Sequence, residues 1–152
     1  MNHYIIDGNN LIGKIKSLQQ MQKKDRQSSR EGLVSFLNSA LAGKKIKLTL
    51  HLDGFSSAPL NLSKGKIVYS QNKTSDYYIR KEIDESKNPK LITLITSDHS
   101  LMNYGKVNSC TVIRSEEFYR EIEKSGEKNI EQEKVKSLEK DKDLFLKLFV
   151  DE

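Results

Sequence analysis

The feature that most constrains the fold is an uncharged run of strand-forming residues at positions 91–95, Leu-Ile-Thr-Leu-Ile. It begins after the breaker pair Asn88-Pro89 and ends at Asp98. A strand with no polar face is typical of the centre of a parallel sheet, where helices cover both faces. Four further runs have strand-like composition or period-two alternation, at residues 3–6, 46–52, 67–69 and 111–113.

Helical patterns lie between these runs. Apolar residues recur at helical spacing over residues 11–21 and 33–41, and the second pattern has Ser28 or Ser29 as its candidate cap, after a polar loop at 23–29. Shorter helical patterns follow at 78–83, 99–104 and from Ser115 onward. Alternation of strands and helices predicts an α/β fold of three layers, α/β/α, with a central, mostly parallel sheet.

The chain of 152 residues fits a single domain, which we place at residues 1–124. The sequence predicts a charged linker and a C-terminal helical tail over residues 125–152, with an apolar cluster at 144–150. That helix either packs on the body of the protein or binds a partner.

Composition excludes several classes of protein. A lone cysteine, Cys110, excludes a disulfide within the chain and argues against a cysteine-based zinc site. The N-terminus lacks the features of a signal peptide, and no apolar run reaches the ~18 residues of a membrane helix, so we expect a cytoplasmic protein with no membrane association. The net charge is +5, which suits either a polyanionic partner or an ordinary solvated surface.

Aspartates occur where the predicted strands end. Asp7, Asp53 and Asp98 each close a strand-like run, and Asp76 lies where a loop gives way to a helix. The carboxyl ends of parallel strands meet at one edge of the sheet, so these four carboxylates are expected along that edge. Like charges held together call for a counter-ion, and carboxylate oxygens suit Mg²⁺ or Mn²⁺, which activate water for phosphodiester hydrolysis.

Each of these residues also has a purely structural interpretation. Asp and Asn cap helices and form turns after strands, and Asp76 suits such a helix start. Asn10 suits either a ligand-binding amide or a helix cap, and Thr96 and Ser97 either position a carboxylate or phosphate or form a simple turn. The coincidence of three strand-end aspartates with one at a helix start favours the metal site.

The segment Ile5-Ile6-Asp7-Gly8-Asn9-Asn10-Leu11-Ile12-Gly13 resembles the opening motif of the YacP-like branch of NYN domains, in the PIN-like nuclease superfamily. Three later segments match in order: Leu52-Asp53-Gly54, Lys73-Thr74-Ser75-Asp76-Tyr77-Tyr78-Ile79 and Ile95-Thr96-Ser97-Asp98. The resemblance implies metal-dependent cleavage of RNA, with metal-site carboxylates at Asp7, Asp76 and Asp98, an accompanying amide at Asn10, a further acidic partner at Asp53, and supporting roles for Asn9, Thr96 and Ser97.

One departure from the family pattern concerns the last motif. Many NYN relatives carry another acid shortly after the final Asp, whereas this chain has His99-Ser100-Leu101. We therefore expect one strong metal position rather than two. His99 offers a proton or a phosphate contact in place of the acid, or is simply solvated.

The leading hypothesis is a divalent-metal ribonuclease, with endonuclease favoured over exonuclease. Its expected partner is RNA, and a ribosome or another ribonucleoprotein is a further candidate partner. Basic and aromatic residues near the motifs are candidates for RNA binding: Lys14, Arg30, Lys73, Tyr77, Arg80 and Lys81. The alternative is an RNA-binding module of the same fold that has lost catalysis. A third reading, a receiver-type phospho-acceptor domain, suits Asp7 and Asp53 but lacks the acidic pair and the lysine that such domains require.

Overall fold

A computed structural model describes residues 1–124, and the predicted linker and tail at 125–152 lie outside the described residues. Five strands form one sheet in the order β3-β2-β1-β4-β5, and all four pairings are parallel. The strands are β1 (Asn2–Asp7), β2 (Ile46–Leu52), β3 (Gly65–Tyr69), β4 (Ile92–Ile95) and β5 (Thr111–Ile113). The predicted α/β fold with a parallel sheet is confirmed.

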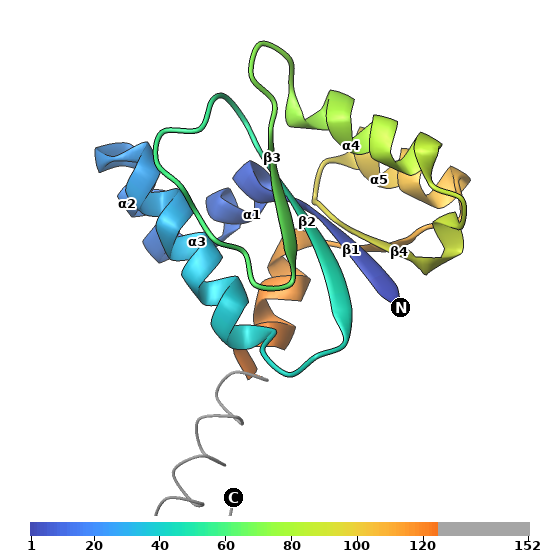
Figure 1. Cartoon of the computed structure of the whole chain (residues 1–152), viewed down its shortest axis with the longest axis horizontal. Coiled ribbons are helices and arrows are strands. Elements are labelled where there is room, and N and C mark those ends of the chain that lie inside the picture. Colours follow the sequence, from blue (N-terminus) through green and yellow to red (C-terminus); the bar gives the residue numbers. More distant parts are fainter. Residues whose placement is uncertain (125–152) are drawn as a thin grey trace, which may run out of the picture.

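Helices cover both faces of this sheet (Figure 1). One face carries α4 (Ser75–Glu85) and α5 (His99–Val107). The other carries α1 (Gly8–Lys14), α2 (Lys16–Lys24), α3 (Arg26–Ala40) and a helical segment at 115–124. A single 3₁₀ turn, η1 (Pro89–Leu91), leads into β4.

The apolar central strands follow from these two helical layers. On β1, Ile5 packs into the core under α4 and α5, and Ile6 packs into the larger core under α1 and α3; both side chains are fully buried. All four residues of β4 are buried as well. Because neither face meets water at Ile5 and Ile6 or along β4, these positions favour apolar side chains on both sides of the strand.

Two local predictions were wrong. The single helix expected at 11–21 is interrupted at Ile15, whose backbone is extended (φ −107°, ψ 110°) and whose side chain is 3% exposed. The polar loop expected at 23–29 is also replaced, since α2 continues to Lys24 and α3 begins at Arg26. Asp25, rather than Ser28 or Ser29, caps α3, by accepting a hydrogen bond from the Gln27 amide. The bend at Ile15 lets both short helices bury apolar residues in one core.

The order of the strands defines where a ligand is expected. The chain runs outward from β1 through β2 to β3 and then returns to β4 on the opposite side of β1. This reversal lies between the carboxyl ends of β1 and β4, the position at which open α/β sheets bind ligands. Asp7 ends β1, and Asp98 follows β4 by three residues, so both lie at this reversal point.

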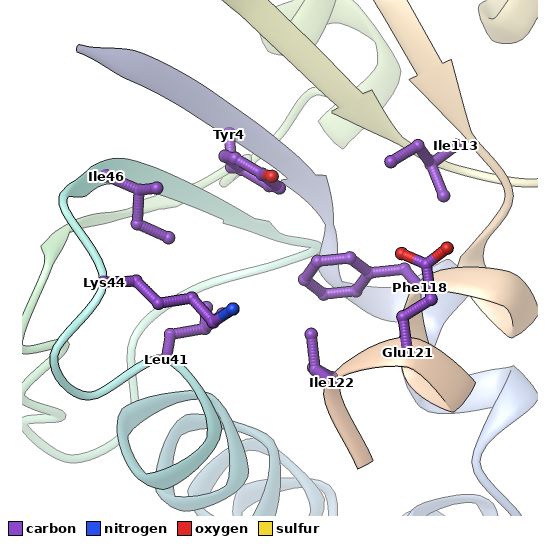
Figure 2. Close-up of a pocket in the computed structure, with 8 residues that line it drawn as sticks. All are labelled: Tyr4, Leu41, Lys44, Ile46, Ile113, Phe118, Glu121 and Ile122. Carbon is purple, nitrogen blue, oxygen red and sulfur yellow. The ribbon is translucent and has the colours of Figure 1, made fainter. Parts of the chain in front are cut away.

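A pocket of about 100 Å³ lies elsewhere, between the start of β2 and the helical segment at 115–124 (Figure 2). Ile46, the first residue of β2, lines it together with Lys44, Phe118 and Ile122. The strand-end aspartates lie at the other end of the strands, so this pocket is separate from them. Within residues 1–124, every helix is too short or too polar to cross a membrane.

Candidate metal and nucleic-acid site

Asp7 lies at the centre of the carboxyl edge and connects the ends of β1 and β4. Its Oδ2 accepts a hydrogen bond from the Thr96 hydroxyl at 2.9 Å. The same hydroxyl oxygen accepts a hydrogen bond from the Asp98 amide at 3.1 Å. Thr96 is fully buried, so its side chain is a fixed link between the two aspartates.

The environment of Asp7 favours positive charge. Burial raises the pKa of Asp7 to about 6, although the hydrogen bond from Thr96 acts in the opposite direction. The nearby charges of Asp53 and Asp98 raise this pKa further. A carboxylate that is buried beside two others gains most from a proton or from a cation.

Asp53 joins the end of β2 to the start of α4. Its Oδ1 accepts a hydrogen bond from the Ser75 amide at 3.0 Å, and its own amide donates to Asn9 Oδ1 at 2.8 Å. Arg26 and Arg30 both donate to the Asp53 carbonyl oxygen, at 2.7 and 2.6 Å. These four contacts fix both the backbone and the side chain of Asp53.

Asn10 ties together the loops that follow β4 and β5. Its Oδ1 accepts hydrogen bonds from the Ser97 amide at 2.9 Å and from the Ser115 hydroxyl at 2.7 Å. The residue lies inside α1, whose N-cap is Asp7, so Asn10 is not the helix cap. Its amide oxygen therefore orients the loop that leads to Asp98.

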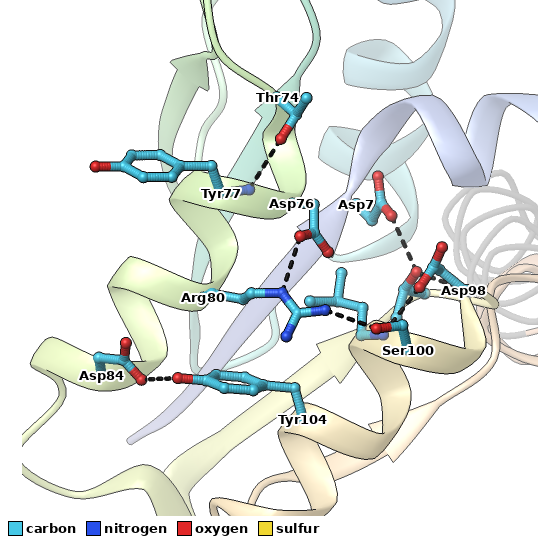
Figure 3. Close-up of polar contacts among 11 residues, drawn as sticks. Asp7, Thr74, Asp76, Tyr77, Arg80, Asp84, Asp98, Ser100 and Tyr104 are labelled. Carbon is cyan, nitrogen blue, oxygen red and sulfur yellow. Dashed lines mark hydrogen bonds and ion pairs between the residues drawn. The ribbon is translucent and has the colours of Figure 1, made fainter.

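Asp76 and Asp98 lie on the helices that border the site (Figure 3). Asp98 caps α5 and accepts a hydrogen bond from the Leu101 amide at 2.9 Å, as the structural interpretation predicts. Thr74, not Asp76, caps α4, and Asp76 Oδ2 instead accepts from Arg80 Nε at 2.8 Å. Within residues 1–124, the Oδ2 atoms of Asp53 and Asp98 make no hydrogen bond, so each retains an oxygen for a ligand.

The donor set suits a hard divalent cation in its chemistry. Asp7, Asp53 and Asp98 supply carboxylate oxygens, which Mg²⁺ and Mn²⁺ prefer, and burial together with the charges of Asp53 and Asp98 disfavours the ionised form of Asp7 unless a cation balances it. In the described part of the chain, however, no three His, Cys, Asp or Glu side chains are grouped closely enough to form a metal site. Asp76 is the carboxylate that is already paired with a cationic side chain.

The predicted RNA-binding residues fall into two environments. Lys73 places its ammonium 4.5 Å from the ring centroid of Tyr77, which is 45% exposed, and Lys81 is exposed on α4. Lys14 is also exposed, with its Nζ 3.9 Å from a Glu116 carboxylate oxygen. Arg30, in contrast, is 2% exposed and donates to the carbonyls of Asp53 and Phe55, so it holds a loop in place.

Sequence reasoning missed an acidic residue at the same edge of the sheet. Glu116 accepts a hydrogen bond from the Ser97 hydroxyl, and this contact together with the Lys14 charge lowers the Glu116 pKa. Ser115-Glu116 directly follows the strand at 111–113, so the rule that selected the other aspartates would also have found Glu116. His99, the residue in place of the expected acid, is exposed at the first position of α5.

A second missed group is a buried polar network between α4 and the sheet. Glu82 accepts hydrogen bonds from His51 Nε2 at 2.8 Å and from the Thr49 hydroxyl at 2.7 Å, and His3 Nε2 lies 2.7 Å from that hydroxyl. Burial acts to raise the Glu82 pKa, but the hydrogen bonds outweigh it and bring this pKa well below its ordinary value. The sequence pattern that could have predicted this network is three polar residues on one face of β1 and β2, at positions 3, 49 and 51.

Comparison with known proteins agrees with the resemblance drawn from the motifs. The crystal structure of Rae1 (YacP) from Bacillus subtilis superimposes with a TM-score of 0.71 at 20% identity and covers 90% of this chain and 81% of that one. A mutant form of Rae1 gives a TM-score of 0.72 at 17% identity, covering 90% and 83%. No curated protein matches the chain. The model of the YacP-like NYN domain matches residues 4–149, and the chain therefore belongs to this family of PIN-like nucleases.

Proposed function

We propose that this protein is a divalent-metal-dependent ribonuclease, and an endonuclease, that hydrolyses RNA phosphodiester bonds at the carboxyl edge of its sheet. The observation that carries the proposal is the place of Asp7, a partly buried carboxylate at the end of β1 that the Thr96 hydroxyl links to the backbone of Asp98. Its pKa, raised to about 6 by burial and by the charges of Asp53 and Asp98, supports the proposal. Its place at the strand-order reversal of a PIN-like fold supports the same conclusion.

In this proposal Asp7, Asp53, Asp76 and Asp98 hold Mg²⁺ or Mn²⁺. The cation, when bound, supplies the Lewis acidity that makes water a nucleophile toward phosphorus and balances charge on the phosphate. Thr96 keeps Asp7 and Asp98 at a fixed separation, and Asn10 holds the loop between them through Ser97. Lys73 and Tyr77, exposed next to Asp76, bind the backbone and an unpaired base of the RNA.

The test is incubation of the purified protein with cellular RNA in Mn²⁺, in Mg²⁺ and in EDTA, beside the variants Asp7→Asn and Asp98→Asn. Glu85→Gln is the matched control, because it removes one negative charge from an exposed residue at the end of α4. We expect internal cleavage in either metal, none in EDTA, loss in both aspartate variants and no change in Glu85→Gln.

The alternative function, an RNA-binding module without catalysis, makes a different prediction for the same experiment. It expects RNA binding without cleavage in every metal, which would also be the result for a nuclease that requires a ribosome or another ribonucleoprotein. Adding ribosomes to the reaction separates these two cases. Cleavage that survives both aspartate substitutions would contradict the proposed site.

A further inference from the structure

Arg80 occupies the space between the two helices that border the site. Its Nε donates to Asp76 Oδ2 at 2.8 Å, and its Nη2 donates to the Ser100 hydroxyl at 2.9 Å. The guanidinium carbon lies 4.7 Å from the ring centroid of Tyr104, and the Tyr104 hydroxyl in turn donates to Asp84 (Figure 3). Arg80 therefore bridges α4 and α5 immediately beside Asp76 and Asp98.

The contacts of Arg80 leave part of its hydrogen-bonding capacity unused. A guanidinium has five N–H donors, and within residues 1–124 the hydrogen bonds to side chains use only Nε and Nη2. The side chain is 31% exposed. Tyr104 and Ser100 restrain the guanidinium from α5, so it would keep its place if the contact with Asp76 were lost.

Asp76 differs from the other candidate ligands because its carboxylate forms an ion pair with a cationic side chain. Asp7, Asp53 and Asp98 accept hydrogen bonds from a neutral hydroxyl or from backbone amides, whereas Asp76 is paired with a full positive charge. Arg80 occupies Oδ2 of Asp76, whereas Oδ1 makes no hydrogen bond within residues 1–124, so a divalent cation that used Oδ2 or both oxygens would displace Arg80.

We propose that Arg80 is a substitute cation at Asp76, which a divalent metal displaces, and that the released guanidinium then binds the phosphate of the RNA to be cut. The planar guanidinium fork of arginine can donate two parallel hydrogen bonds to two phosphate oxygens. The contact of the Arg80 guanidinium with the Tyr104 ring holds it beside the aspartates. Metal binding and phosphate binding are thereby coupled through one side chain. This inference rests on the proposed function, since it assigns a role at the same site.

The proposal predicts opposite effects of Arg80→Ala on two ligands. Removal of the competing charge should tighten Mn²⁺ binding about two- to threefold, as expected for an exposed i,i+4 ion pair, measured by the paramagnetic resonance signal of free Mn²⁺. Loss of the charged hydrogen bonds to phosphate should raise KM for a labelled single-stranded RNA about tenfold at saturating Mn²⁺. Lys87→Ala is the matched control, because Lys87 is exposed beyond the end of α4.

Arg80→Lys separates charge from geometry. A lysine at this position retains a positive charge near Asp76, so Mn²⁺ binding should stay near the wild-type value, while KM should still rise because the fork is lost. Weaker Mn²⁺ binding in a folded Arg80→Ala protein would overturn the proposal, since Arg80 would then be holding Asp76 in place for the metal. An unchanged KM would overturn the phosphate role.

These results do not depend on the outcome for the proposed function. If the wild-type protein binds Mn²⁺ and RNA without cleaving, RNA affinity measured by fluorescence anisotropy replaces KM. Tighter Mn²⁺ binding together with weaker RNA binding in Arg80→Ala would then support the displacement of Arg80 by the metal. If the wild-type protein binds no Mn²⁺, the proposal that a metal displaces Arg80 is overturned. Thermal denaturation of each variant shows whether it is folded before either affinity is compared.

Discussion

Asp7, a candidate site residue, reduces the stability of the protein when its side chain is ionised. Its pKa is about 6 in the folded protein against an ordinary value of 3.8, so the folded state binds the proton more tightly than the unfolded state. Stability from this group is therefore greatest at low pH and falls as pH rises from about 4 to about 6. Above pH 7 the ionised side chain costs about 3 kcal/mol, for a shift of this size.

Asp7→Asn should accordingly stabilise the metal-free protein. In EDTA at pH 7.5 we expect urea denaturation to show a gain of about 3 kcal/mol, because the amide is never charged. At pH 4.5 wild-type Asp7 is mostly protonated in the folded protein but mostly ionised in the unfolded chain, so the gain should fall to about 1 kcal/mol. Glu85→Gln, on the exposed end of α4, should show no such pH dependence. A variant less stable than the wild type at pH 7.5 would contradict the raised pKa.

Arg30 is the second residue whose role depends on burial. Its guanidinium lies under Asp53 and Phe55, donates to both carbonyls and lies 5.1 Å from the ring centroid of Tyr69. Burial also lowers the pKa of Arg30, as expected for a cation inside the protein. The loop that carries Asp53 thus depends on a fork-shaped donor.

Arg30→Lys should destabilise the protein by about 1–3 kcal/mol, because one ammonium cannot reproduce both hydrogen bonds of a guanidinium that is only 2% exposed. Arg26→Lys is the control, since Arg26 is exposed and makes one of the two hydrogen bonds to the same Asp53 oxygen. Urea denaturation at pH 7 compares the two variants. A loss in Arg26→Lys as large as that in Arg30→Lys would show that burial is not what makes Arg30 important.

At the scale of elements, α4 is held to the sheet by Glu82 as well as by its apolar residues. Two of its side chains, Ile79 and Ile83, enter the core, and Glu82 reaches His51 and Thr49 on β2. The position of α4 fixes where Asp76 and Arg80 lie. A partly buried carboxylate with hydrogen bonds on both oxygens specifies one placement of the helix more sharply than apolar contact alone.

Glu82→Gln should loosen this helix. A neutral amide has only one acceptor oxygen and cannot accept from both β2 side chains, so we expect a loss of about 1–3 kcal/mol at pH 7. Because the folded pKa of Glu82 is depressed, its stabilisation is present above about pH 4.5 and is lost as pH falls toward the folded value. The deficit of the variant should therefore shrink on acidification. Hydrogen exchange that speeds up equally in α4 and α5 would contradict a role specific to α4.

Helices and strands could be predicted from the sequence where a pattern of neighbouring residues determines them. Apolar runs and breaker pairs placed all five strands, and a parallel sheet followed from their alternation with helices. The break at Ile15 was not predictable, since it follows from packing two short helices into one core. At the site, strand ends identified Asp7, Asp53 and Asp98, but the pairing of Asp76 with Arg80 and the burial of Arg30 depend on contacts between separate elements.

At the scale of the whole molecule, charge is divided between the site and the surface. The chain carries a net charge of +5, while the carboxyl edge of the sheet gathers at least three aspartates near one another. A basic surface around an acidic centre attracts a polyanion and leaves the centre for a cation. Lys73 and Lys81, exposed near the start of α4 and along it, belong to that basic surface.

RNA binding should therefore weaken steeply with salt. For a single strand, the logarithm of the binding constant falls with the logarithm of salt concentration by about 0.7 per phosphate contacted. If Lys73 and Lys81 each contact a phosphate, the double variant Lys73→Ala/Lys81→Ala should reduce the slope by about 1.4, measured by fluorescence anisotropy in EDTA. Lys87→Ala/Lys90→Ala removes the same charge from exposed residues beyond the end of α4 and should leave the slope near its wild-type value. Equal slopes in the two double variants would mean that net charge, and not a defined surface along α4, attracts the RNA.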